Sequence, residues 1–541
     1  MTGWITDTPG STRFPLYTRS NASDVMPDPV SPLGATLSIV AVMEGFRDGQ
    51  VRNGAFEMSE LTAEGINPTC GFFNGFFYVN ASVVRVMGER SGAGAAGIDA
   101  AFFGNRPDTP PYVAHPDDQS EAAAARLAER VGWVLSTTEY PELDEHKAIA
   151  DRARADRPDL STLSDIELVA RAREMTPLVR IMFDDHAITS SNSAIGPTIL
   201  GQLVPDLMLR LISGAGDVDS AAPSHSMWNL SRLDRNSDEY AVAFASFLET
   251  YGCRGPGEWD PYSDTWETRH DLAHALIDTM RNTPSDQAPD NAYAQVVADR
   301  EAATAEALAR VDGDEDTTAT ILAAQASALR FNSWRERSKT NCVKVIHEQR
   351  VVLRELGRRH LPDERDVFML LDAELDAFVT DPEHMTATIA ARRADWGRLW
   401  ELEPPYFIEA DKGIPSLDDL HAKGPSNADL ATVGTELTGA AGCSGVVEGL
   451  ARVINDPSDP SALQPGDILV APNTDPSWTP LFVAAGGVVV GVGSMNSHAV
   501  IVSRELGLPC VVSVTDCTTR IPDGARLRVD GDAGTVTVLQ V

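Results

Sequence analysis

The sequence predicts a two-part protein, with a mainly α-helical N-terminal domain followed by a smaller C-terminal β/β/α domain. Alanine-rich stretches with helical periodicity occupy much of the chain between Ser120 and His360. From residue 436 onward, short β-branched runs alternate with glycine-bearing turns, a pattern typical of strands. A segment rich in Gly, Pro, Ser and Asp, 411–434, lies between the two patterns, and we expect a linker at 426–435.

Composition limits the class of protein. The chain has 541 residues, a hydrophobic content of 43% and a formal net charge of −35. Nucleic acids and anionic membranes both require basic surface, so neither is an expected partner. The six cysteines are scattered without a CxxC pair, which is typical of reduced thiols in a cytoplasmic protein. No signal-peptide pattern and no bilayer-spanning apolar run is present, and we expect a cytoplasmic location.

The N-terminal domain, 1–425, carries its helical pattern in three stretches. We expect helices within Ser120–Met280, Asn291–Asp312 and Thr317–His360. Ser164 and Glu167 form a capping box at the start of one helix, which we expect to end near His186.

Two segments of this domain depart from the helical pattern. The prolines of Arg13–Leu37 predict an extended segment and exclude a helix before Pro32. The aromatic stretch Cys70–Met87 has phenylalanines at helical spacing, but its two glycines leave a strand possible. Core packing is the expected role of these rings, and Phe76 and Tyr78 are our choices for the wall of a substrate site.

Charged residues in two places are candidates for substrate binding. The irregular loop Tyr251–Trp266 sets Arg254 and Glu258 among aromatic residues, which suits a binding site. A structural turn held by an arginine–carboxylate pair fits the same pattern. Arg335 and Lys339 are spaced i,i+4, so they share one helical face that could hold phosphate or a substrate anion. Solvated surface is the alternative for that pair.

Two other clusters are interpreted as having no ligand. Asp184, Asp185 and His186 are adjacent on a helix and do not share a face, so we interpret them as solvated surface. The small-residue stretch Ser91–Gly97 has no lysine and no strand before it, and we interpret it as a loop. We therefore expect no metal and no cofactor to be bound on this chain.

The most informative stretch surrounds His498. The β-branched run Val488–Val490 is followed by small and polar residues, then by an apolar stripe that stops at Gly507. This pattern predicts a strand, a glycine-bearing turn and a helix, with Ser497 as N-cap and His498 as first helical residue. Free backbone N–H groups at a helix start bind anions, so an imidazole there could receive a phosphoryl group. The helix end disfavours an imidazolium and keeps the ring neutral and nucleophilic. A surface or capping histidine is the simpler alternative.

From Leu437 to the end, the chain resembles the mobile phosphohistidine domain of phosphoenolpyruvate synthase, pyruvate phosphate dikinase and rifampin phosphotransferase. Four blocks carry the resemblance, in order: Gly442–Ile454, Leu463–Phe482, Gly493–Leu506 and Asp523–Leu539. In that family, the histidine that matches His498 carries a phosphoryl group between two active sites. The resemblance implies a swivelling phosphohistidine domain at 436–541. The groups that we expect to bind the phosphoryl group are Gly493, Ser494, Ser497 and Thr474. The family usually has two glycines where Gly493 and Ser494 stand.

The N-terminal domain also resembles part of this family. The stretches TRSNASDVMPDPVSPL, YGCRGPGEWDPYSDTW and NSWRERSKTNCVKVIHEQR are similar to the substrate domain of rifampin phosphotransferases. A histidine often precedes the arginine of the second motif in those proteins, whereas this chain has Cys253, so Glu258 becomes our candidate base. The overall plan looks like the catalytic subunit of phenylphosphate synthase, or a rifampin phosphotransferase without its ATP-grasp domain.

The resemblance implies a dikinase-type phosphotransferase. ATP and Mg²⁺ on a separate ATP-grasp subunit would phosphorylate His498, with AMP and phosphate as by-products. The phosphoryl group would then pass to a hydroxyl, on a phenol or alcohol, of a small and largely apolar acceptor. Phosphoenolpyruvate is a less expected donor, because the chain ends directly after the mobile domain. A non-catalytic phosphocarrier or regulatory protein is one alternative, and a relative that uses phosphorylation to drive condensation or dehydration is another.

Overall fold

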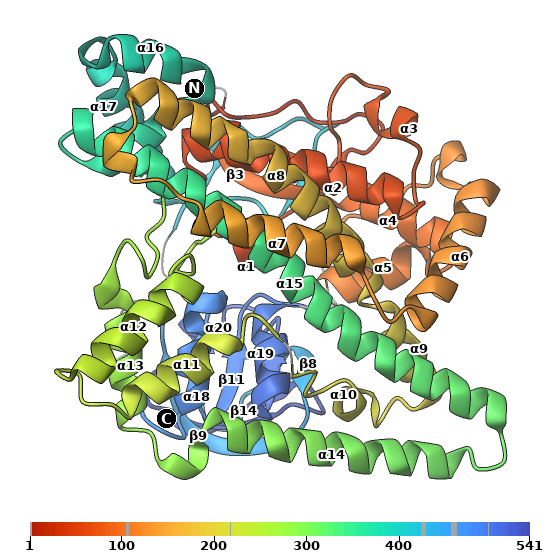
Figure 1. Ribbon diagram of the computed structural model, residues 1–541. Helices are drawn as coiled ribbons and strands as arrows, with labels where there is room; N and C mark the ends of the chain where they lie inside the picture. Colours follow the sequence, from red (N-terminus) through yellow and green to blue (C-terminus); the bar gives the residue numbers. More distant parts are fainter. Residues whose placement is uncertain are drawn as a thin grey trace.

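The computed structural model describes residues 3–103, 106, 108–216, 218–423, 429–455, 463–495 and 497–541. It confirms the predicted fold class, with a mainly helical part followed by a β-rich C-terminal domain (Figure 1). The long helix α15 (Glu315–His360) crosses the molecule between the N-terminal helices and the C-terminal domain. Residues of the site described below come from both sides of this helix. No helix of the described residues is long and apolar enough to cross a membrane.

The helical domain is built around α15, α8 (Asp165–Asn192) and α2 (Val40–Arg52), which pack against one another. α8 begins at the predicted capping box but continues past His186, because apolar residues keep facing the core up to its last turn. The other helices of the chain before the C-terminal domain are α1 (Ala22–Val25), α3 (Met58–Thr62), α4 (Ala81–Ser91), α5 (Gly94–Phe103), α6 (Glu121–Ser136), α7 (Pro141–Ala155), α9 (Ile195–Leu203), α10 (Met208–Leu211), α11 (Ala222–Ser231), α12 (Asp238–Tyr251), α13 (His270–Arg281), α14 (Pro289–Arg310), α16 (Leu375–Thr380) and α17 (Pro382–Leu399).

A four-stranded sheet joins the N-terminal segment to the end of the helical domain. Its order is β2-β3-β1-β5, formed by β2 (Cys70–Phe73), β3 (Phe76–Asn80), β1 (Leu16–Thr18) and β5 (Phe407–Glu409). The phenylalanines of the aromatic stretch therefore lie in a hairpin, whose turn places Asn74 and Gly75 at positive φ, and helix α4 begins directly after it at Ala81. A second, two-stranded sheet pairs β4 (Leu402–Glu403) with β6 (His421–Ala422).

Two local expectations for the N-terminal domain are wrong. The helix α1 interrupts the proline-rich segment before Pro32, because its single turn fits between the prolines. The buried Arg19 supports it by donating to the carbonyl oxygens of Met26 and Pro27 at 2.9 and 2.8 Å. Ser91–Gly97 is not a simple loop, since α4 ends at Ser91 and α5 begins at Gly94.

The C-terminal domain contains an eight-stranded sheet with the order β7-β14-β13-β9-β10-β11-β12-β8. Its strands β9 to β12 run parallel, and the outer strands pair antiparallel. The strands are β7 (Glu436–Thr438), β8 (Ala440–Cys443), β9 (Val446–Val453), β10 (Ile468–Ala471), β11 (Gly487–Val490), β12 (Cys510–Val512), β13 (Arg526–Asp530) and β14 (Thr535–Gln540), and the helices are α18 (Thr479–Ala484), α19 (His498–Leu506) and α20 (Cys517–Arg520). Each of the four sequence blocks coincides with elements of this fold.

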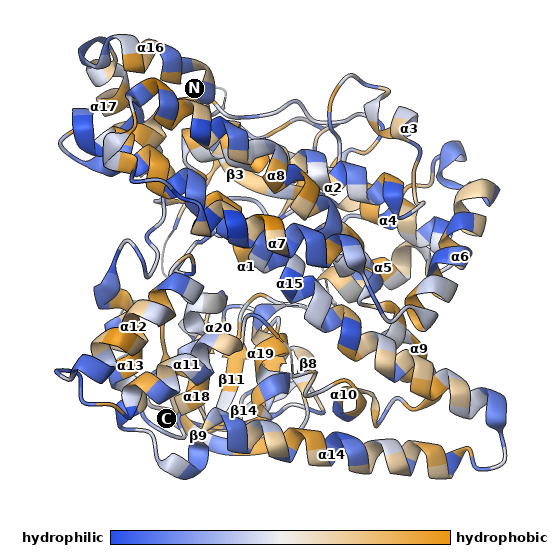
Figure 2. Cartoon of the chain, in the orientation of Figure 1, coloured by the Kyte–Doolittle hydropathy of each residue, from blue (hydrophilic) through white to orange (hydrophobic). Residues whose placement is uncertain are grey.

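The two parts share an apolar core. Helices α11, α12 and α13 contribute Trp228, Phe247 and Ile277 to one cluster with Phe482 and Val500 of the C-terminal domain. The hydropathy colouring shows apolar residues on α11, α18 and β11, where these elements lie together (Figure 2). The predicted linker 426–435 lies partly outside the described residues, which resume at 429. The C-terminal domain is thus docked on the helical part.

Candidate active site

His498 lies at the interface between the two parts of the molecule. It is the first residue of α19, as predicted, and only 6% of it is exposed. The hydroxyl of Thr479 is 3.1 Å from its Nε2, whereas its Nδ1 is buried without a hydrogen-bond partner among the described residues. One ring nitrogen is therefore held in place while the other has no partner, the division of roles that a nucleophilic imidazole requires.

Burial and nearby positive charge keep this ring neutral. Burial lowers the pKa of His498 well below its ordinary value, and the ammonium of Lys339 lowers it further. A neutral imidazole is the form that attacks phosphorus. The sequence predicted a neutral ring from the helix end alone, and the structure adds a larger cause, since the ring is removed from water and faces cations.

The loop before His498 has little free space. A Cβ on Gly493 would lie 2.9 Å from the Cβ of Val512 and 3.0 Å from Ser497 Oγ, so a side chain does not fit without a shift. Arg504 supports the loop from behind by donating to the carbonyl oxygens of Gly442 and Met495 at 3.0 and 3.2 Å. The guanidinium of Arg504 thus has a structural role.

Two hydroxyls near His498 are free to bind an anion. Ser497 occupies the N-cap position, but its side chain makes no capping hydrogen bond. Its Oγ and the Oγ1 of Thr474 are both buried and without a partner among the described residues. A hydroxyl can donate one hydrogen bond and accept others, so both groups are available to an anion that reaches this loop. Ser494, the fourth expected phosphoryl ligand, instead contacts Asn21 at 3.4 Å.

A group of charged residues from the helical part faces His498. We call it the charged cluster, and it consists of Arg254, Glu258, Arg335, Glu336 and Lys339. Arg254 Nε donates to Glu258 at 2.8 Å, and Lys339 Nζ is 3.9 Å from the same carboxylate. Arg335 donates to Glu336 at 2.5 Å. Arg254, Arg335 and Lys339 all lower the pKa of His498, so these sequence-predicted residues lie together near the imidazole.

The charged cluster contains an ionised carboxylate and polar atoms that have no hydrogen-bond partner among the described residues. Burial opposes ionisation of Glu336, but Lys339 and Arg335 outweigh it and lower its pKa to about 2. Burial raises the pKa of Glu258 from its ordinary value, although Arg254 and Lys339 act against this. Arg254 Nη2 and Glu258 Oε1 have no hydrogen-bond partner among the described residues. Three cations thus face a site in which polar atoms are left for a ligand.

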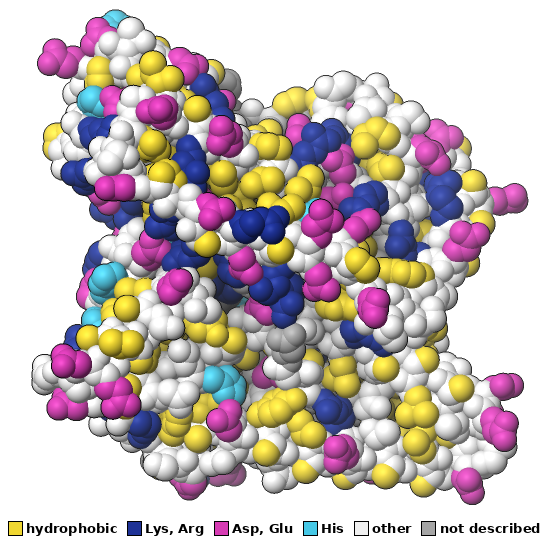
Figure 3. All heavy atoms as spheres, viewed as in Figure 1, with side chains coloured by type: hydrophobic (Ala, Val, Ile, Leu, Met, Phe, Trp, Pro, Cys, Tyr) yellow, Lys and Arg dark blue, Asp and Glu magenta, His cyan; other side chains and the backbone are white. Residues whose placement is uncertain are grey.

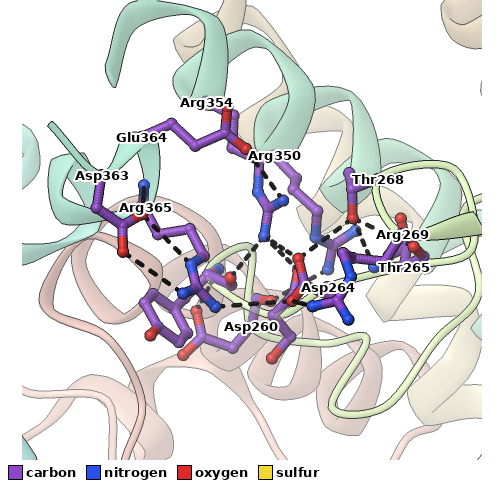
Figure 4. Close-up of polar contacts among 12 residues, drawn as sticks. Asp260, Asp264, Thr265, Thr268, Arg269, Arg350, Arg354, Asp363, Glu364 and Arg365 are labelled. Atoms are coloured by element: carbon purple, nitrogen blue, oxygen red, sulfur yellow. Dashed lines mark hydrogen bonds and ion pairs between the residues drawn. The ribbon is translucent and has the colours of Figure 1, made fainter. Parts of the chain in front are cut away.

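A second polar network holds the loop of Arg254 and Glu258 on α15. Arg350 donates to the carbonyl oxygens of Glu258 and Asp260 at 2.8 and 3.1 Å. Arg354 reaches Asp264 at 2.7 Å, and Figure 4 shows these arginines converging on the loop. An irregular loop without regular backbone pairing needs such bonds to keep one shape. They fix the direction in which Glu258 points.

Lys and Arg side chains are gathered in the middle of the face shown in Figure 3, over α7 and α15. The rest of this face shows many Asp and Glu side chains, in keeping with the net charge of −35. Cations of this surface are paired, since Lys147 of α7 and Lys344 of α15 both contact Asp151, at 2.6 and 2.5 Å.

The N-terminal segment contributes a part of the site that the sequence did not identify. Asn473 donates to the carbonyl oxygen of Ser23 at 3.2 Å, so the turn that contains α1 rests on the C-terminal domain. Asp24, in this turn, is 8% exposed, and burial raises its pKa to about 7. The only signal in the sequence was the resemblance of TRSNASDV to an entry motif.

Phe76 and Tyr78 are placed elsewhere. Their rings pack in an apolar cluster with Tyr17 and Ile408, beneath the guanidinium of Arg19. The structure does not bring them together with the charged cluster, because the hairpin directs them into the four-stranded sheet. Cys253 is also directed inward, into an apolar cluster, and burial raises the pKa of its thiol.

The interpretation of Asp184, Asp185 and His186 as solvated surface is wrong. Asp185 is fully buried, with its carboxylate 2.5 Å from His146 Nδ1 and 3.1 Å from the Tyr140 hydroxyl. His186 packs against the rings of Phe183 and Trp259, with centroids 5.2 and 6.1 Å away. Helices on both sides of α8 cover these residues, which local sequence spacing does not reveal. Within the described residues, no group of three or more His, Cys, Asp or Glu is placed to hold a metal ion.

Comparisons with known proteins agree with this geometry. Residues 463–534 match the PEP-utilising enzyme mobile domain, and residues 233–336 match the rifampicin phosphotransferase fourth domain. The first match contains His498, and the second contains Arg254, Glu258 and Arg335. The matches confirm the resemblance of the C-terminal domain to the PEP-utilising mobile domain and of the helical part to rifampicin phosphotransferases. The likeness to the catalytic subunit of phenylphosphate synthase stays a prediction.

Whole-chain relatives extend the similarity. An uncharacterised protein of Mycobacterium tuberculosis is 27% identical over 582 residues, which cover 99% of this chain and 63% of that protein. The rifampicin phosphotransferase of Streptomyces sviceus is 31% identical over 310 residues, and that of Bacillus subtilis is 30% identical over 310 residues. Each match covers 55% of this chain and 34% of the relative. The chain thus spans about a third of the length of these two phosphotransferases.

Proposed function

We propose that this protein is a phosphotransferase in which His498 carries a phosphoryl group to the hydroxyl of a small acceptor. The observation that carries the proposal is the position of a neutral, buried imidazole with one unpartnered nitrogen opposite Arg254, Arg335 and Lys339. A transferring phosphoryl group develops charge on its oxygens, and fixed cations in a water-poor site stabilise that charge. The rifampicin phosphotransferases among the relatives support the same chemistry.

The docked arrangement corresponds to the transfer step to the acceptor. The cations of the charged cluster would bind the phosphoryl oxygens, together with the free hydroxyls of Ser497 and Thr474. Glu258 orients Arg254 through a buried ion pair and is the carboxylate that the sequence suggests as base. A phenolic or alcoholic acceptor, largely apolar, would lie beside the rings of Phe183 and Trp259.

We infer that the phosphoryl group originates from ATP with Mg²⁺ bound on an ATP-grasp partner, through dikinase chemistry at His498. Domain docking of this kind requires His498 to leave the charged cluster for loading and then return. The test is incubation with γ- and β-labelled ATP and Mg²⁺, with and without a candidate ATP-grasp subunit. Label on His498 only with the subunit supports the partner, and equal label without it contradicts the partner.

The carrier role of His498 has its own test. His498→Ala should abolish transfer from donor to acceptor, whereas binding of the acceptor should remain. The label in the wild-type protein should be lost in acid and retained in base, as expected for a phosphoramidate. Turnover by His498→Ala at the wild-type rate would contradict the proposal.

A further inference from the structure

We propose that Asp24 is the group that removes the proton from the acceptor hydroxyl. This inference rests on the proposed function, because it assigns a role within the same transfer. Asp24 is 8% exposed, its Oδ1 is buried, and neither oxygen has a hydrogen bond or ion pair among the described residues. An unpartnered carboxylate is costly to bury, so the site is incomplete without a ligand at this position.

The position of Asp24 is fixed by contacts with the phosphohistidine domain. Asn21, just before α1, has a φ of 57° and contacts Ser494 of the loop that precedes His498. The carbonyl oxygen of Ser23 accepts from Asn473, on the loop that also contains Thr474. The turn of Asp24 therefore touches both loops whose free hydroxyls surround the phosphoryl position.

Asp24 and His498 face the same cations. Arg335 and Lys339 are the two charged groups that lower the pKa of Asp24 against the effect of burial, and both also act on His498. Within the described residues, neither cation forms an ion pair with Asp24. Asp24 and His498 therefore lie within electrostatic range of the same two cations, to which the proposed transfer would bring the acceptor hydroxyl.

Asp24 suits proton removal better than Glu258 does. Glu258 is in contact with Arg254, and its protonation would leave a buried guanidinium without its counter-ion. Protonation of Asp24 breaks no ion pair among the described residues. Burial raises its pKa to about 7, so it changes protonation state near neutral pH, where a general base is most effective.

Transfer from His498 to the acceptor breaks two bonds and moves one proton to Asp24. The acceptor O–H bond breaks and its proton passes to the Asp24 carboxylate, while the new O–P bond forms. The P–N bond to His498 breaks and its electron pair stays on the imidazole. The ring then takes a proton from water, and Asp24 releases its proton to water. The products are the phosphate ester and neutral histidine.

The test uses the full chain loaded chemically with labelled phosphoramidate, with His498→Ala as the background. Release of label is followed from pH 5.5 to 8.5 as phenyl phosphate, with phenol as probe, and as inorganic phosphate, with water as acceptor. In the wild type, release should rise with pH through the region near 7. Asp24→Asn should take up label normally but release it about 100-fold more slowly, without the pH-dependent limb. Asp28→Asn, a change at a half-buried residue of the same segment whose carboxylate pairs with Lys423, should behave as the wild type.

Further variants show which group causes the pH dependence of label release. The groups that face Asp24 are Arg335 and Lys339 from α15 and Tyr406 from the segment before β5. Lys339→Met should move the pH-dependent rise in label release to higher pH, because Asp24 loses a cation that lowers its pKa. Asp24→Asn should remove the rise. Glu258→Gln should keep the limb.

Each outcome has one interpretation. Label in the wild type no greater than in His498→Ala overturns the proposed function. Normal label with equal release rates and equal pH profiles in Asp24→Asn overturns the role of Asp24 alone. If circular dichroism shows Asp24→Asn to be unfolded, Asp24→Glu carries the test, since it keeps the carboxylate. A flat profile in Asp24→Glu overturns the role, and a retained limb supports it.

Discussion

The hydroxyl of Thr479 should be needed for transfer through His498, and Thr479→Val tests this need directly. Valine has nearly the shape of threonine, so the change removes the contact at 3.1 Å to Nε2 without opening a cavity. Thr479 is fully buried, and water does not replace the lost partner. Leaving a buried polar group unsatisfied costs about 1–3 kcal/mol. If that cost raises the free energy of the correctly oriented imidazole, transfer should slow by about 10- to 100-fold, since each 1.4 kcal/mol is a factor of about ten.

The assay is single-turnover release of labelled phosphoryl group from the loaded protein, with circular dichroism as the check of fold. Thr479→Ser is the matched control, because it keeps the hydroxyl and removes only a methyl group, and it should retain most of the wild-type rate. A Thr479→Val variant that transfers as fast as Thr479→Ser would refute the idea that this hydroxyl orients the ring.

Three more predictions follow from the geometry. Gly493→Ala should reduce transfer and cost about 1–3 kcal/mol of stability, because its Cβ would meet Val512, whereas Gly132→Ala, with open space around it, should have no such effect in thermal unfolding. Glu505→Gln should weaken docking of the C-terminal domain, since both carboxylate oxygens accept backbone N–H groups, from Ala215 at 2.9 Å and Gly216 at 3.0 Å; faster hydrogen exchange of these two amides would be the evidence, and unchanged exchange would count against it. The imidazole signals of His498 should not titrate between pH 5.5 and 8 in the docked protein, because burial lowers its pKa; a midpoint near 6.5 in an NMR titration would show instead that the ring is exposed.

Local sequence pattern was sufficient to predict the elements of the C-terminal domain, but it was insufficient to predict which residues of the helical part face His498. The start of α19 at His498 could be predicted because strand, turn, N-cap and apolar stripe are all encoded within Val488–Gly507. The partners of His498 could not, because their proximity depends on α15, on an irregular loop and on a single turn near the N-terminus. Asp24 shows the difficulty most clearly, since no local pattern, and only the family resemblance of its segment, distinguishes it from an exposed aspartate.

The choice of Phe76 and Tyr78 for a substrate wall, and of the acidic run for solvated surface, rested on residues judged without their surroundings. The structure shows the core packing expected of the aromatic rings, because the hairpin at Asn74–Gly75 directs Phe76 and Tyr78 into an apolar cluster. Asp185 lies in an acidic run typical of surface, yet His146 and Tyr140 from a neighbouring region cover it. Burial of a polar group is a property of packing between distant segments, and spacing along the chain does not record it.

The charge balance of the site explains why docking and transfer belong together. Arg254, Arg335 and Lys339 supply three positive charges, and Glu258, Glu336 and Asp24 supply three carboxylates, of which Glu336 is held ionised by its cations. When Asp24 is protonated the buried cations are in excess, and a phosphohistidine at His498 would bring negative charge that offsets this excess. The phosphorylated domain should therefore dock more tightly than the unmodified one, and the preference should disappear after the acceptor has taken the phosphoryl group. Under the proposed function, loss of that charge on transfer would favour release of His498 from the charged cluster.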